Sequence, residues 1–202
     1  MAIITLPTDF AFDAAGFSFL SFNYGETSDV TGDSAERLGG PPRWATQLRS
    51  LDKLSIAEAG RWQALMMKLR GAVNHLAVFD PVRTYPEGTM RGTPTLDVSV
   101  SAGATSLALV ATGTLKAGDL LQIGTGVGTS QLISVMEDAT AAAGKITVTF
   151  EGPLRYGFTA GTAVTWDHPR FYGKMRGSQP TWNYEKGMRG AGGFQLDIVE
   201  AW

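Results

Sequence analysis

The first fifty residues alternate between hydrophobic and polar positions, with a long polar interruption. Residues 17–24 (FSFLSFNY) follow a period of two and carry aromatic side chains on both sides, which predicts a strand covered on both faces. Residues 25–42 contain almost no apolar side chains and end in Gly-Gly-Pro-Pro, so we expect a long exposed loop. The extended pattern resumes in residues 43–51, which predicts a further strand.

One segment of the chain has the spacing of an amphipathic helix. Ser55 opens a Ser-x-x-Glu pattern, in which its hydroxyl accepts from the amide of Glu58 and the carboxylate accepts from the amide of Ser55. We therefore expect a helix over residues 56–70, closed by Gly71 in the left-handed conformation. Its apolar side chains recur every three or four residues and are predicted to pack in the core: Ile56, Ala59, Trp62, Leu65, Met66 and Leu69.

A buried strand and a connector follow the predicted helix. Residues 74–81 (NHLAVFDP) predict a strand that stops at Asp80-Pro81, because proline disfavours helix before it and donates no hydrogen bond to a sheet. Residues 81–94 contain three prolines and two glycines, which is typical of a connector.

The middle of the chain differs in composition from both ends. Between Thr95 and Asp167, short aliphatic and threonine-rich strands alternate with turn signals at intervals of about ten residues. The two ends are richer in aromatic residues and would bury their apolar faces against each other. We predict a mainly β protein with one α-helix: a split β-frame domain of residues 1–90 and 167–202, and an inserted small β-barrel or sandwich domain of residues 91–166.

Residues 124–135 (GTGVGTSQLISV) have the glycine spacing of a phosphate-binding loop at first sight. A dinucleotide loop requires a further glycine at position 129 and a helix after it, but Thr129 stands there and a β-branched segment follows. No Lys-Ser or Lys-Thr pair follows either, so the Walker pattern fails. We interpret this stretch as a hairpin turn, whose glycines adopt positive φ without steric cost.

The composition narrows the chemistry that the chain can perform. It has no cysteine, two histidines and a formal net charge of −2 over 202 residues. Thiolate chemistry is thereby excluded, and the charge lacks the basic excess of a nucleic-acid binder. We expect His75 and His168 to pack or to support turns, and no sequence motif of a hydrolase or metalloprotease is present. We expect no enzymatic activity, no cofactor and no metal site.

The sequence also bears on where the chain is made. It contains no apolar run long enough to cross a membrane, and its N-terminus lacks the basic start and cleavage site of a secretory signal. We expect synthesis in the cytosol.

Three alternatives remain open at the level of residues. Tyr156, Phe158 or Trp166 could stack on sugar rings, which would make the protein a carbohydrate-binding module. The paired carboxylates of a cell-wall hydrolase could approach each other through the fold, because their spacing in sequence is not fixed. The basic and aromatic segment 168–202 could stack nucleic-acid bases, but Tyr, Trp and Arg also anchor protein interfaces, and the near-neutral charge favours protein partners.

Several phrases, taken in order, resemble a known family. They are LMMKLRG, HLAVFDP, a connector with PEGT and GTP, LKAGDLLQIG, KITVTFEGPLR and FQLDIVEAW. In this order they resemble the distal tail or tail-tip hub proteins of long-tailed (siphovirus-type) bacteriophages, over roughly residues 50 to 202. Gly152 departs from the family pattern, where a second proline is more usual.

The resemblance implies a structural subunit of the virion tail tip, assembled in the host cytoplasm. Such proteins have a belt-type frame domain that closes a homo-oligomeric ring, commonly a hexamer, between the tail-tube proteins and the baseplate or hub. It implies no membrane partner and no specific nucleic-acid binding. We expect the oligomer interface in the loop 25–42, the strand 43–48 and the tail 182–202, with these candidate residues: Arg43, Trp44, Trp182, Tyr184, Phe194 and Trp202.

Overall fold

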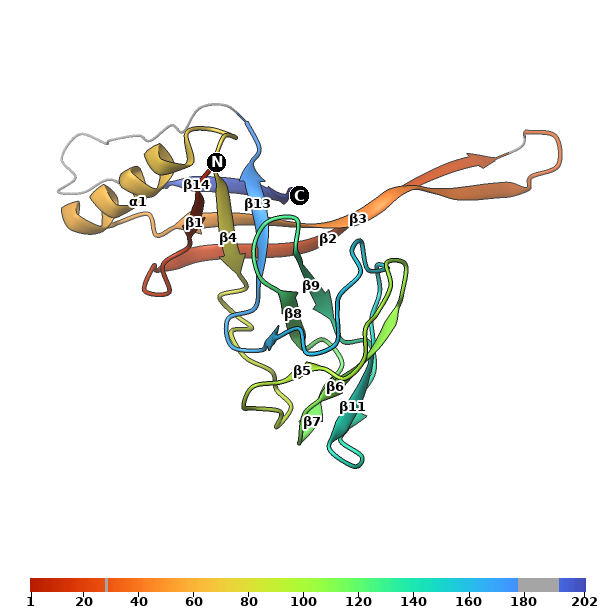
Figure 1. The fold of residues 1–202 in the computed structure, drawn as a ribbon. Helices are drawn as coiled ribbons and strands as arrows, with labels where there is room; N and C mark the ends of the chain where they lie inside the picture. The colour runs from red at the N-terminus through yellow and green to blue at the C-terminus, as the bar shows by residue number, and fades with distance from the viewer. Residues whose placement is uncertain (28, 178–192) are drawn as a thin grey trace.

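The protein is mainly β with one helix, as the sequence predicts (Figure 1). The computed structural model describes residues 1–27, 29–177 and 193–202. Within them, a curled, mixed, half-barrel sheet of six strands has the order β1-β4-β13-β14-β3-β2, and three small antiparallel sheets have the orders β10-β7, β11-β6-β5 and β12-β8-β9.

The helix and the strands are numbered in chain order. The bounds are β1 (Ile3–Thr5), β2 (Phe12–Thr27), β3 (Ser34–Ser50), α1 (Ile56–Leu69), β4 (His75–Phe79), β5 (Thr95–Leu96), β6 (Ser106–Val110), β7 (Thr114–Leu115), β8 (Leu120–Gly124), β9 (Ser130–Ser134), β10 (Ala139–Thr140), β11 (Lys145–Thr149), β12 (Val164–Thr165), β13 (Arg170–Met175) and β14 (Gln195–Glu200). In the six-stranded sheet only the pair β1 and β4 is parallel.

Helix α1 covers one face of the six-stranded sheet, and its start is the predicted one. Ser55 caps it and forms the full capping box with Glu58. At its end, Arg70 rather than Gly71 is the capping residue in the left-handed conformation, with φ of 48°, and Gly71 follows at φ of 64°. The predicted stripe is buried except for Ile56, which is exposed.

Aromatic rings join the helix to the sheet. Trp62 is 1% exposed and stacks on Phe194, with ring centroids 6.0 Å apart and an angle of 4° between the planes. Phe10 and Phe12 pack against the same indole ring. Strand β4, buried along its whole length and ending before Asp80, confirms the strand predicted in residues 74–81. These contacts form the larger of two apolar cores.

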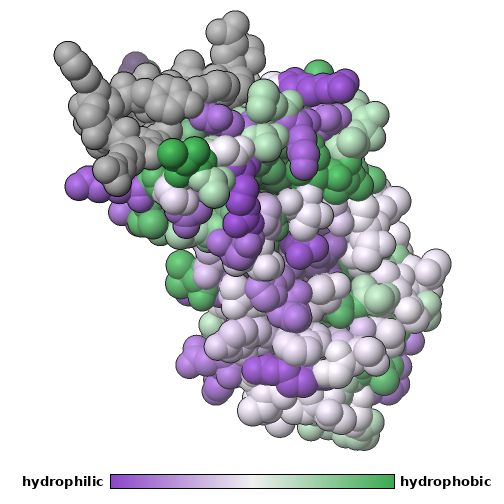
Figure 2. All heavy atoms as spheres, turned by 90° about the vertical axis from the view of Figure 1, so that its left-hand side faces the viewer, coloured by the Kyte–Doolittle hydropathy of each residue, from purple (hydrophilic) through white to green (hydrophobic). Residues whose placement is uncertain are grey.

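The chain between β4 and β13 gathers around a second apolar core. Its buried members run from Met90 to Val164, and they come from the three small sheets and their turns. The segment 124–135 is the predicted hairpin of β8 and β9, with Gly124, Gly126 and Gly128 at positive φ. On the face shown in Figure 2, hydrophobic and hydrophilic side chains are interspersed over the described residues.

Two expectations for the N-terminal region are wrong. Residues 25–42 are not a long loop, because β2 continues to Thr27 and β3 begins at Ser34, so they form most of a hairpin. The strand at 17–24 is not covered on both faces, because Phe19 and Phe22 are 37% and 42% exposed. Strand β2 lies at the edge of the sheet and, among the described residues, pairs with β3 alone.

Candidate interaction surface

The hairpin of β2 and β3 extends well beyond the rest of the molecule (Figure 1). We call its distal part, residues 22–27 and 29–40, the arm. Strand β3 pairs with β14 only from Ala45 to Arg49, so along the arm the two strands have each other as their only sheet partner among the described residues. The arm is therefore a two-stranded ribbon.

The base of the arm has an irregular register. Leu20 pairs with Arg43 and Phe22 pairs with Gly40, so that Pro41 and Pro42 of β3 lie opposite the single residue between Leu20 and Phe22. Proline has no N–H to donate, and bulges are one of the few places where a sheet accepts it. A bulge increases the local twist, which sets the direction in which the arm leaves the sheet.

Two of the predicted interface residues, Arg43 and Trp202, meet beside the arm. The guanidinium carbons of Arg43 and Arg155 lie 4.3 and 4.1 Å from the centroid of the Trp202 ring. An arginine over an indole face is attracted by the ring quadrupole. Trp202 remains 43% exposed, so a large aromatic surface is held in one orientation at the molecular surface.

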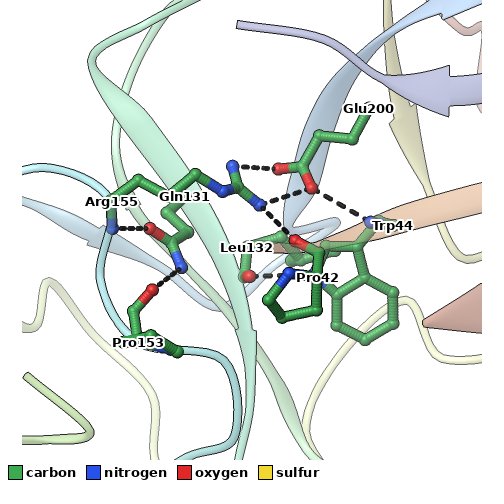
Figure 3. Close-up of polar contacts among 7 residues, drawn as sticks. All are labelled: Pro42, Trp44, Gln131, Leu132, Pro153, Arg155 and Glu200. Atoms are coloured by element: carbon green, nitrogen blue, oxygen red, sulfur yellow. Dashed lines mark hydrogen bonds and ion pairs between the residues drawn. The ribbon is translucent and has the colours of Figure 1, made fainter. Parts of the chain in front are cut away.

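A buried ion pair supports this aromatic group (Figure 3). Arg155 donates from Nη1 and Nη2 to the two carboxylate oxygens of Glu200, at 2.7 and 2.5 Å. Glu200 also accepts from the backbone N–H of Trp44, at 3.0 Å. The side chains of Arg155 and Glu200 are only 10% and 5% exposed. A bidentate pair of this kind fixes the relative orientation of the two side chains and also stabilises their contact.

The same group joins the segment between β4 and β13 to the six-stranded sheet. Arg155 and Gln131 belong to this segment, and the Gln131 side chain accepts from the backbone N–H of Arg155 and donates to the carbonyl of Pro153 (Figure 3). The Trp44 indole N–H donates to the carbonyl of Leu132 in β9, at 2.9 Å. The second core is therefore tied to strands β3 and β14 by directional polar contacts.

Our sequence reasoning missed Arg155 and Glu200 as partners. Their 45-residue separation has no local pattern. One signal was available in β14: Leu196, Ile198 and Glu200 alternate on one side of the strand, and Leu196 and Ile198 are apolar. A carboxylate at the third inward position requires a buried partner, because an unpaired charge is costly there.

The remaining predicted interface residues have different positions. Trp44 is 8% exposed and Phe194 is fully buried against Trp62, so both belong to the apolar core of the chain itself. Trp182 and Tyr184 lie outside the residues that the structure describes.

A groove of about 360 Å³ lies between the base of the arm and the ends of β13 and β14. Arg43, Lys174 and Arg176 bring three cationic side chains to it, and its one acidic side chain is Glu200, which Arg155 already neutralises. The other lining residues are mostly apolar: Leu20, Phe22, Met175, Val199 and Ala201. The groove thus combines positive charge with apolar surface.

The two histidines have structural positions. His75 is 5% exposed in β4, and its burial, followed by the nearby Lys174 and the N-terminal amine, lowers the pKa of its imidazole. His168 has φ of 48°, contacts Asp167 through Nδ1 at 2.6 Å and packs edge-on against Phe79. In the described parts of the chain no group of three or more His, Asp or Glu side chains is placed to hold a metal ion.

A second hollow, of about 310 Å³, lies beside the connector after β4. Asp119 lines it, but its carboxylate accepts from the backbone N–H groups of Glu87, Gly88 and Lys116, at 2.8, 3.2 and 2.7 Å. These three hydrogen bonds satisfy the buried carboxylate and hold the connector in place, which gives Asp119 a structural role. Over the described residues, no helix is long and apolar enough to span a membrane.

The aromatic residues considered for sugar binding are divided between two places. Tyr156 and Phe158 line a shallow groove, but Phe158 is only 7% exposed and belongs to the second core. Trp166 does not line that groove: its indole N–H donates to the carbonyl of Gly92, and the Arg91 guanidinium lies 5.0 Å from its ring centroid.

Comparisons with known proteins assign the chain to no family. No protein-family model matches the chain, and a search of curated proteins gives no significant match.

Proposed function

We propose that the chain is a structural, non-enzymatic subunit of a bacteriophage tail tip, of the distal tail type, which forms a ring between the tail tube and the baseplate or hub. The arm is the observation that carries this proposal. It is a long hairpin that extends from the body and finds no sheet partner beyond its own two strands among the described residues.

An extended hairpin of this kind needs a second molecule. A two-stranded hairpin alone is marginally stable in water, and stable sheets need further strands or packing against another surface. An arm that leaves its own subunit gains such packing on a neighbour. Each subunit then gives one arm and receives another, which is a head-to-tail contact that closes into a ring when the rotation between subunits allows it.

The edges of the six-stranded sheet support the same proposal. In the part of the chain that the structure describes, β2 leaves one edge of the sheet unpaired and β1 leaves the opposite edge unpaired. Free edges pair readily with other chains. The acidic side chains of Glu26, Asp29 and Asp33 on the arm limit unspecific pairing, since charge on an edge disfavours aggregation.

The two apolar cores are consistent with the two domains, a belt and a peripheral barrel, of the family that the sequence resembles. In this proposal residues 1–90 and 167–202 form the belt, and residues 91–166 form the inserted peripheral barrel. The ion pair of Arg155 and Glu200 holds the barrel in one orientation on the belt. Arg43 and Trp202 belong to the contact surface beside the arm.

The test is the oligomeric state of a variant without the arm. Replacing residues 23–39 with Asn-Gly joins Phe22 to Gly40 by the two-residue turn that hairpins favour. Native mass spectrometry and electron microscopy should show closed rings for the unaltered chain and monomers for the shortened one. The exposed substitution Lys53→Glu is the control and should leave the rings intact.

Two results would contradict the proposal. One is an unaltered chain that remains monomeric at every concentration tested, and the other is a set of rings that survives removal of the arm. Circular dichroism and tryptophan fluorescence of the shortened chain show whether the body has kept its fold. Immunogold labelling with antibodies against the chain should mark one end of the tail in virions produced by a host that encodes it.

A further inference from the structure

The groove at the base of the arm carries positive charge that the chain does not neutralise within its described residues. Arg43, Lys174 and Arg176 line it, and none of them forms an ion pair there. Arg43 is half-buried, and its Nε is a buried donor without an acceptor in this part of the chain.

The far end of the arm has the opposite charge. Residues 24–37 contain four acidic residues and one basic residue. Among the acidic ones, Glu26, Asp29 and Asp33 are exposed, and no ion pair neutralises them within the described residues. The acidic tip and the basic groove are therefore complementary in charge.

One molecule cannot bring these two features together. Leu20, Phe22 and Arg43 of the same hairpin line the groove, and the hairpin runs away from it toward the tip (Figure 1). The tip of one subunit can reach only the groove of another copy.

We propose that the acidic arm tip of each subunit docks in the basic groove of the next copy. The carboxylates accept from the three cationic side chains, and the apolar lining contacts the strand backbone. Charge pairs at such a site guide the approach of the two surfaces and fix their register. This inference rests on the proposed ring, and it names the surface by which one subunit holds the next.

The absence of cysteine allows a direct test by disulfide formation. Asp29→Cys and Arg176→Cys are prepared as separate variants, mixed and mildly oxidised. A covalent dimer is expected in the mixture at least ten times faster than in a mixture of Asp29→Cys and Lys53→Cys. A chain with both Asp29→Cys and Arg176→Cys should give a ladder of covalent multimers on a non-reducing gel.

Charge reversal provides a second, independent measurement. Lys174→Glu with Arg176→Glu, or Asp29→Lys with Asp33→Lys, should each weaken assembly at least tenfold in native mass spectrometry. In a mixture of the two variants, both head-to-tail contacts between unlike chains pair opposite charges, so assemblies in which the two variants alternate should form again. The control reverses Lys53 and Glu137, which are exposed outside the groove and the arm, and should assemble normally.

The outcomes separate this inference from the proposed function. Rings that persist after both reversals, together with cross-linking no faster than in the control mixture, would refute the docking of tip in groove and leave the ring standing. An unaltered chain that never assembles would refute both. Loss of assembly by each reversal, with recovery in the mixture, supports the docking.

Discussion

The ion pair between Arg155 and Glu200 gives the most quantitative prediction. Glu200 accepts two hydrogen bonds from Arg155 and one from the backbone of Trp44, in a site where both charged side chains are at most 10% exposed. Arg155→Met places an apolar side chain of similar length at this position and removes the two N–H donors, Nη1 and Nη2. The carboxylate of Glu200 then stays buried with one N–H partner.

The expected loss of stability is large because the charge that remains has no counterpart. Breaking a buried pair by removing one partner costs about 3–5 kcal/mol of unfolding free energy. A double variant that also carries Glu200→Gln should lose less than the sum of the single variants.

Urea unfolding followed by tryptophan fluorescence measures this loss, at one protein concentration because assembly affects stability. With an m-value of about 2–3 kcal/mol/M, the midpoint should fall by about 1–2.5 M. Arg61→Met is the matched control: Arg61 pairs with Asp9 at 2.6 Å on the surface, where solvent screens the pair and its loss should change the stability little. Equal losses in Arg155→Met and Arg61→Met would refute the reasoning.

Three further predictions concern the core, the helix and the pH dependence. Gly173→Ala should lower the urea midpoint by an amount equivalent to about 1–3 kcal/mol, because a Cβ there overlaps Ile198; unchanged stability would contradict this. Gly60→Ala should raise the melting temperature by an amount that corresponds to about 0.5–1 kcal/mol of unfolding free energy, because glycine weakens the interior of a helix. The position is exposed and no atom lies within 4 Å of the new methyl group, so the methyl group fits without a clash. A lower melting temperature would count against this prediction. Burial and Lys174 lower the pKa of His75 in the folded chain. As the pH falls, the imidazole therefore takes up a proton in the unfolded chain at a higher pH than in the folded chain, and the stability should fall below about pH 6.5. His75→Gln should flatten this part of a stability profile measured from pH ~7 to ~5, and an unchanged slope would argue against the assignment.

Helices and turns that depend on interactions between residues close together in the sequence were predictable from it. The capping box of Ser55 and Glu58, followed by an apolar stripe, predicts α1 with its first residue correct. The glycines after Ile123 predict the β8–β9 hairpin, because positive φ at alternating positions suits a turn and not a phosphate loop. In both cases the interacting groups lie within a few residues of each other.

The arm was misread for a physical reason. A strand is recognised by alternation when one face is buried, and residues 25–42 have no such alternation because the arm does not cover either apolar core of the chain. Backbone pairing between β2 and β3 depends on hydrogen bonds that every residue except proline can make. Composition alone therefore could not distinguish this ribbon from a polar loop.

The sequence by itself determined the β-rich class, the helix and its start, the buried strand β4 and the glycine turn, since each depends on propensity or periodicity along a short stretch. Only the tertiary structure decided which residues meet at the candidate interaction surface. Arg43, Arg155 and Trp202 come from three distant segments, and Phe194 is removed from that surface into the core. Their contacts depend on sheet order and on the direction of the hairpin, which are properties of the folded chain as a whole.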